Sequence, residues 1–203
     1  MSRPPAPFDE SDGSRVPDRA DGLGRARRLL LSPREEWRRI ARERPDDRSL
    51  WLQWVMPLAA IGPLAGLVGG LVFGAPAANL VGIDLGAGFY WRGALAGFLG
   101  ALLGVVAVAT LARLLAARFG ATCDGRTGLT LAAYSFTAAW LAGTFALVPT
   151  LAPLGLLGLY SIYLLNLGAR ELTGVSDDRA LGYTAALVVG GVIAALLPGW
   201  LFA

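Results

Sequence analysis

Hydrophobic residues gather in five long runs after the first quarter of the chain. The runs cover 54–73, 93–114, 129–148, 150–167 and 181–202. Each is close to the ~20 residues that an α-helix needs to cross the hydrocarbon core of a bilayer. The runs lack the alternation of apolar and polar residues seen in membrane β-strands, and they are too long for barrel strands. The pattern predicts an all-α, polytopic membrane protein with five transmembrane helices.

A shorter helical pattern precedes the first run. Ser32 fits the N-cap of a helix, Pro33 fits its first position, and Pro45 would end it. At 100° per residue, Trp37 and Ile40 share one narrow arc, and charged residues fill the rest of the circumference. The segment is therefore predicted to be a short amphipathic helix.

Two surroundings suit the apolar arc of this helix. The helix can lie in the headgroup plane, with Trp37 and Ile40 dipped inward and Arg34 and Arg38 reaching anionic lipid. Alternatively, the same arc can pack on the protein's own membrane domain. We take Trp37, Ile40, Arg34 and Arg38 as the predicted membrane-surface contact and keep the second arrangement as the alternative.

Three regions follow from this pattern. Residues 1–28 carry few large apolar side chains, so they bury too little surface to offset the entropy cost of ordering, and we expect a disordered cytoplasmic tail. Residues 29–50 form the amphipathic interfacial segment. Residues 51–203 form the five-helix domain.

Composition excludes several chemistries. The chain is 55% apolar and 16% charged, and its mean hydropathy is +0.54. It has no His, its 18 basic residues are all Arg, and it has one Cys. Imidazole bases, histidine metal ligands, lysine Schiff bases, Walker A loops and intrachain disulfides are therefore ruled out. We expect no enzyme activity, no cofactor and no metal.

The arginines predict the orientation. Twelve of the 18 precede Trp51, and Arg92 is the single one in the loop between the first two runs. Because arginine is retained on the cytoplasmic side, we expect a multi-pass protein of the cell inner (plasma) membrane with its N-terminus in the cytoplasm and its C-terminus outside. The net charge of +3 lies beside apolar runs, which favours a lipid bilayer over nucleic acid as the acidic partner.

The third and fourth runs are separated by Pro149 and Thr150 alone, so they are predicted to form a tight helical hairpin. Residues at equal separation from its apex lie at one depth in the membrane. This places six polar residues together as a candidate intramembrane cluster: Tyr134, Ser135, Thr137, Tyr160, Tyr163 and Asn166. The cluster is either a structural clasp with an interfacial tyrosine belt or a site for a ligand or partner.

Several short motifs occur together in a defined order along the chain. They are Leu-Ser-Pro-Arg-Glu-Glu-Trp at 31–37, Met-Pro-Leu-Ala-Ala-Ile at 56–61, Ala-Tyr-Ser-Phe-Thr at 133–137, Trp-Leu-Ala-Gly at 140–143, Leu-Val-Pro at 147–149 and Leu-Tyr-Ser-Ile-Tyr-Leu-Leu at 159–165. In this combination the chain resembles the Yip-type (Ypt-interacting-protein) family of membrane proteins, in its bacterial branch. One departure is Ala138, where such proteins often carry Pro.

The resemblance implies a five-span integral membrane protein with a cytoplasmic N-terminus. Eukaryotic members bind small GTPases in vesicle traffic, whereas bacterial members have no settled role. We therefore expect a non-enzymatic membrane organiser or adaptor that binds lipid, a protein partner or a second copy through its cytoplasmic face. The alternative is a small-solute transporter or channel subunit with a polar path along Tyr134, Thr137, Tyr160 and Asn166.

Overall fold

The computed structural model describes residues 21–43, 45–74 and 85–201. Two short helices come first, α1 (Asp21–Leu31) and α2 (Pro33–Glu43). Five long helices follow, and all but the last are built from more than one segment. The first consists of α3 (Asp47–Leu50), η2 (Trp51–Val55) and α4 (Met56–Phe73), and the second of α6 (Gly86–Ala116) and η3 (Ala117–Phe119). The third consists of α7 (Gly125–Ser135), α8 (Thr137–Ala142) and η4 (Gly143–Leu147), the fourth of η5 (Pro149–Leu159) and α9 (Tyr160–Thr173), and the fifth is α10 (Asp177–Leu201).

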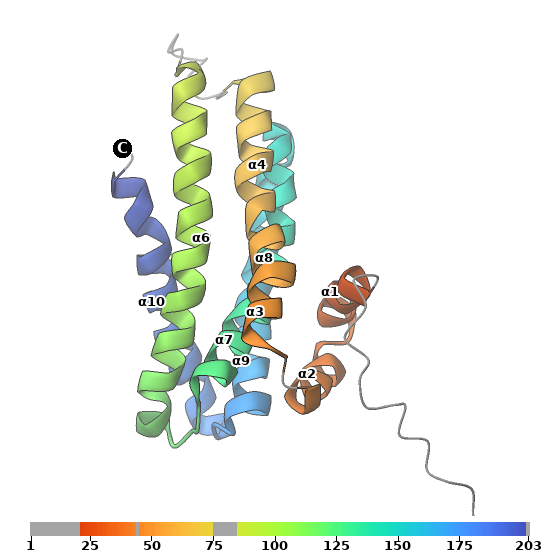
Figure 1. Ribbon diagram of the computed structural model, residues 1–203, viewed down its shortest axis with the longest axis vertical. Coiled ribbons are helices and arrows are strands. Elements are labelled where there is room, and N and C mark those ends of the chain that lie inside the picture. The colour runs from red at the N-terminus through yellow and green to blue at the C-terminus, as the bar shows by residue number, and fades with distance from the viewer. Residues whose placement is uncertain (1–20, 44, 75–84, 202–203) are drawn as a thin grey trace, which may run out of the picture.

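The five long helices are long and apolar enough to span a membrane, as the sequence predicts. They stand side by side in one bundle, with α6 between α4 and α10 (Figure 1). We call the end at which α6 stops and α7 and α10 begin the arginine-rich end. Five arginines lie at or near this end: Arg113, Arg118, Arg126, Arg170 and Arg179. Arg92 lies near the other end of α6.

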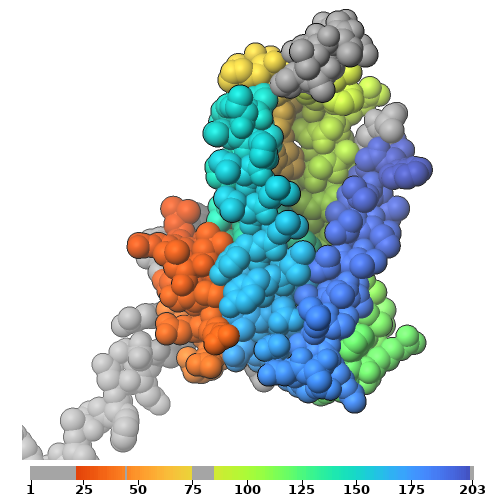
Figure 2. Space-filling model, turned by 180° about the vertical axis from the view of Figure 1, so that it is seen from behind, coloured from red at the N-terminus to blue at the C-terminus, as the bar shows by residue number. Residues whose placement is uncertain are grey.

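The helices α1 and α2 form a hairpin against the flank of the bundle, in the half that contains the arginine-rich end (Figures 1 and 2). The predicted boundary of the tail at residue 28 is therefore wrong, because residues 21–28 make up most of α1. Ala26 and Leu29 of α1 are buried, and this contact supplies the stability that the local sequence lacks. Residues 1–20 of the expected tail lie outside the described residues.

The first spanning helix widens where it passes a proline. The backbone N–H of Met56 bonds to the carbonyl of Trp51, five residues back, so Trp51–Val55 is a π-helical turn. Pro57 has no N–H and its ring would crowd the carbonyl of Gln53 in a regular α-turn. The wider turn before Pro57 lets the helix continue into the membrane without a break.

The third spanning helix is interrupted at Phe136, between α7 and α8, with Ala and not Pro at position 138. Near this break the backbone N–H of Ala139 donates to Ser161 Oγ of α9 at 2.8 Å. A hydroxyl group from the neighbouring helix thus satisfies a backbone donor at the interruption. Val148 is extended between η4 and η5, which confirms the predicted tight hairpin.

Glycine permits the closest approach of α6 and α10. A Cβ atom on Gly100 would lie 2.2 Å from the carbonyl oxygen of Ala195. A carbonyl of the partner helix cannot move aside as a flexible side chain can. The two backbones therefore stay this close only while residue 100 has no side chain.

The substitution Gly100→Ala should weaken the α6–α10 contact by about 1–3 kcal/mol, because the added methyl group overpacks the crossing. Thermal unfolding of the purified protein in detergent micelles measures this as a lower Tm. The matched control is Gly93→Ala on the same helix, where no atom lies within 4 Å of the added Cβ. Equal Tm values for the two variants would contradict the proposed role of the crossing.

Candidate functional site

Trp37 and Ile40 attach α2 to the bundle. Trp37 is 0% exposed and Ile40 1%. The indole of Trp37 lies over Gly168 of α9, where an added Cβ would come within 2.6 Å of the ring. Trp37 also meets Tyr134 of α7 edge to face, with ring centroids 6.3 Å apart. The predicted lipid contact of Trp37 and Ile40 is therefore wrong, and the alternative of a helix packed on its own membrane domain is the arrangement observed.

Four charged side chains join α1 to α2, and we call them the ion cluster: Arg25, Arg28, Glu36 and Glu43. Arg25 and Glu36 are only 5% and 3% exposed. The Nε atom of Arg25 lies 3.7 Å from Glu36 Oε1, and its Nη2 atom lies 2.5 Å from Glu43 Oε2. The Nε atom of Arg28 donates to Glu36 Oε2 at 2.8 Å. Because an unpaired buried charge costs several kcal/mol, the cluster is stable only when it is complete.

The ion pairs also keep both ends of the cluster charged. Burial alone would raise the pKa of Glu43, but hydrogen bonds from Arg25 and Arg39 hold that pKa below its ordinary value. Burial would likewise lower the pKa of Arg25, but Tyr134 and the two carboxylates of the cluster outweigh burial and raise it. The shifts therefore favour the charged forms of Arg25 and Glu43.

Tyr134 connects the ion cluster to the first spanning helix. Arg25 Nη1 lies 3.4 Å from its hydroxyl oxygen, and the guanidinium carbon lies 5.5 Å from the ring centroid. The ring centroid of Trp54, in η2, lies 4.9 Å from the ring centroid of Tyr134. Trp54 Nε1 donates to Thr137 Oγ1 at 3.2 Å. One tyrosine thus packs among α1, α2 and η2, and two of the predicted polar residues, Tyr134 and Thr137, belong to this contact.

The predicted polar cluster is divided among separate contacts. The Tyr160 hydroxyl donates to the carbonyl of Leu30, at the end of α1, at 3.1 Å. Tyr163 lies beside Tyr160, with ring centroids 5.3 Å apart, and is 45% exposed on the outside of the bundle. Asn166 faces α10 and donates to Thr184 Oγ1 at 3.0 Å. These side chains hold helices together and do not line one path.

Ser135, at the end of α7, lines a cavity of about 200 Å³ whose other walls come from α6, α8, η5, α9 and α10. Its hydroxyl oxygen is buried and has no hydrogen-bond partner among the described residues. Ser161 is the other polar side chain in the lining, and its hydroxyl is already bonded to Ala139. No ionisable side chain of the described residues lines this cavity, so it offers a hydroxyl group in apolar surroundings and no site for a charged solute.

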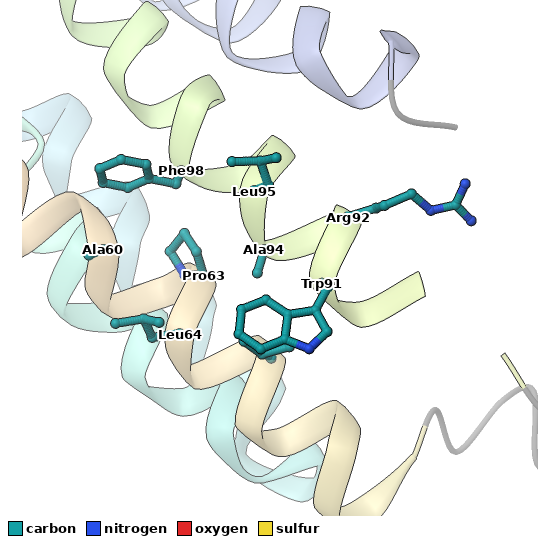
Figure 3. A pocket seen from close by; sticks show the side chains of 9 residues that line it. Ala60, Pro63, Leu64, Trp91, Arg92, Ala94, Leu95 and Phe98 are labelled. Carbon is teal, nitrogen blue, oxygen red and sulfur yellow. The ribbon is translucent and has the colours of Figure 1, made fainter. Parts of the chain in front are cut away.

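A larger cavity of about 470 Å³ lies between α4 and α6, towards the end opposite the arginine-rich end. Figure 3 shows its lining: Trp91 and Phe98 extend from α6, Pro63 lies on α4, and the guanidinium of Arg92 points away. Because its walls are almost wholly apolar, this hollow suits lipid chains and has no group that would select among solutes.

Comparison with known proteins identifies the family. A family model described as the Yip1 domain matches residues 27–198. The chain belongs to the Yip1 family. Comparisons with curated proteins and with solved structures give no match. The match begins within α1 and ends within α10, so it includes the second half of α1, all of α2 and most of the bundle.

The sequence analysis missed Arg25, Glu36 and Glu43 as members of the ion cluster that joins α1 to α2. A sequence signal exists for Glu36 alone, which lies one turn before Ile40 and so borders the apolar arc of α2. A charged residue at the edge of an apolar arc indicates a buried ion pair, because an isolated charge would not be tolerated there.

The substitution Glu36→Gln should loosen the hairpin by about 1–3 kcal/mol, because it removes the counter-charge that Arg25 and Arg28 share, while Arg25 keeps its pair with Glu43. The five spanning helices should remain folded. Limited trypsin digestion of the purified protein measures the effect, since opening of the hairpin exposes the arginines of α1 and α2 to cleavage.

Glu35→Gln is the matched control, because Glu35 is the neighbouring residue of the same helix and is exposed. It should digest at the wild-type rate. If both variants digest equally fast, the buried ion pair does not hold the hairpin.

Proposed function

We propose that this protein is a non-enzymatic organiser or adaptor of the cell inner (plasma) membrane, which binds a protein partner through the cytoplasmic face of its Yip1 domain. The observation that carries the proposal is a hairpin fixed to the bundle with the arginines of α2 exposed on its outer side. A flexible basic segment would not need buried ion pairs, whereas a surface that presents one arrangement to a partner does.

The outward side of α2 supplies the candidate partner surface. Arg34, Arg38 and Arg42 recur every four residues, so they form one stripe along the helix, and all three are exposed. Arg38 lies 3.6 Å from Glu171 of α9, which keeps the stripe beside the bundle. A stripe of guanidinium groups complements an acidic protein surface through bidentate hydrogen bonds to carboxylates.

The distribution of charge supports the proposed orientation. The hairpin lies in the half of the bundle that contains the arginine-rich end (Figure 1). Arg92 lies near the opposite end of α6. Translocating the arginine-rich side would carry nearly every arginine of the chain across the bilayer. We therefore propose that the N-terminus is in the cytoplasm and the C-terminus outside.

The transporter alternative receives no support from the contacts. Tyr134, Thr137, Tyr160 and Asn166 each have a partner on another helix or on the hairpin. A polar path needs groups that are free to exchange partners with a solute. The two cavities described above have apolar walls and no charged group directed inward.

Reporter fusions test the orientation. A reporter active only in the cytoplasm should be active when fused after Arg126, in the first turn of α7 at the arginine-rich end, and inactive when fused after Gly86, at the other end. The reverse result would place the hairpin outside the cell and remove the basis for a cytoplasmic partner.

Replacing Arg34, Arg38 and Arg42 by Gln should reduce capture of the partner at least ~10-fold, because three charges that steer and hold an acidic surface are lost. The measurement is photo-crosslinking in cells from a crosslinker at position 35, followed by mass spectrometry of the captured proteins. Capture by the wild type should weaken as salt is added to membranes before crosslinking. Trp37 and Ile40 are unsuitable for this test because they are buried.

The matched control changes three exposed arginines at the same end that lie outside the hairpin: Arg113, Arg118 and Arg179. This variant has the same net charge and should keep full capture. Equal loss in the two variants would show that general charge, and not the stripe on α2, attracts the captured proteins.

A further inference from the structure

The lipid contact that the sequence assigned to α2 is better placed on α1. Three described side chains of α1 are exposed: Leu23, Arg27 and Leu31. They recur every four residues and so share one face. Leu23 is 85% exposed and Leu31 68%. This face is directed away from α2 and the bundle, because the residues that make those contacts, Arg25 and Leu29, are on the other side.

The contacts with α9 show that α1 lies deeper than α2. Tyr160 of α9 bonds to the carbonyl of Leu30 in α1. Trp37 of α2 lies against Gly168, eight residues further along α9. At 1.5 Å of rise per residue, the two levels are about 12 Å apart, with α1 nearer to the middle of the bundle. Figure 1 shows the same order, with α2 closer to the arginine-rich end.

The surface of α9 places the edge of the hydrocarbon region between these two levels. Ile162 and Tyr163 are exposed, at 41% and 45%, on the outside of the bundle. Beyond them the next exposed side chain of α9 is Arg170. Tyrosine is favoured at the membrane–water interface, and arginine beyond it, in the headgroups or water. The boundary between acyl chains and headgroups therefore lies just beyond the level of Tyr160 and Tyr163, and α1 lies on its acyl-chain side.

We propose that the outer face of α1 binds anionic phospholipid of the cytoplasmic leaflet. Leu23 and Leu31 insert between acyl chains, and Arg27, between them on the same face, pairs with a lipid phosphate. Two leucines beside one cation match a surface that is apolar below and negatively charged above. The leaflet assignment rests on the orientation given under the proposed function, whereas the depth of α1 rests on the contacts with α9 alone.

Spin labels on single cysteines test the depth. Labels are placed at positions 23 and 31, and for comparison at position 42 on the exposed side of α2, in a Cys123→Ser background. The full chain is reconstituted at high lipid excess in vesicles of phosphatidylcholine and phosphatidylglycerol (3:1). Collision rates with oxygen, which concentrates in acyl chains, are compared with those of a water-soluble nickel complex.

Labels at 23 and 31 should favour oxygen over nickel by at least ~3-fold relative to the label at 42. Labels as accessible to nickel as the one at 42 would overturn the proposal. Labels shielded from both reagents, with shielding that fades as lipid is added, would also overturn it, because a second copy of the chain would then cover the face.

The charge requirement has its own test. In vesicles of phosphatidylcholine alone, the oxygen preference of the label at 31 should fall towards that of position 42, and Arg27→Gln should remove this dependence on lipid charge. The variant Arg42→Gln loses the same charge on α2 and should retain the dependence of the oxygen preference on lipid charge. Equal behaviour of the two variants would exclude Arg27 as the phosphate contact. Partner capture by the α2 stripe is measured separately, so failure of either inference leaves the other open to its own test.

Discussion

The structure of the hairpin region depends on one constraint, which is that charge buried beside a membrane must be neutralised within the protein. Arg25 and Glu36 satisfy it together, with Arg28 and Glu43 completing their pairs. Because every member needs the others, the cluster fixes the rotation of both α1 and α2 about their axes. This rotation decides which side chains are buried against Tyr134 and which remain available outside.

Small residues determine how closely the hairpin and the helices of the bundle pack. Gly168 leaves room for the Trp37 ring, and Gly100 lets α6 approach α10. Without a hydrophobic driving force between helices in lipid, such close contacts supply the dispersion energy that holds them together. The hairpin is therefore packed against a closely packed surface, and near the break at Phe136 the backbone N–H of Ala139 donates a hydrogen bond to Ser161 of the neighbouring helix.

The sequence alone was sufficient for the five spans, because length and apolar content are properties of each segment by itself. It was insufficient for Trp37 and Ile40, since an amphipathic arc indicates only that one face avoids water and not whether protein or lipid covers it. It also gave the depth of Tyr134 and Tyr160 but not their direction. Rise per residue sets height, whereas rotation about the helix axis is set by tertiary packing.

The helix α1 shows why tertiary contacts were needed. Its arginines and its two early glycines resemble a disordered segment, and no local feature marks Arg25 as different from Arg27. Only the partners distinguish them: Arg25 meets Glu43 and Tyr134, while Arg27 is exposed. Since the ion cluster joins α1 to α2, a change in how deeply α1 lies in the membrane also displaces the arginine stripe of α2. Lipid charge and partner binding would thus be coupled through the same four side chains.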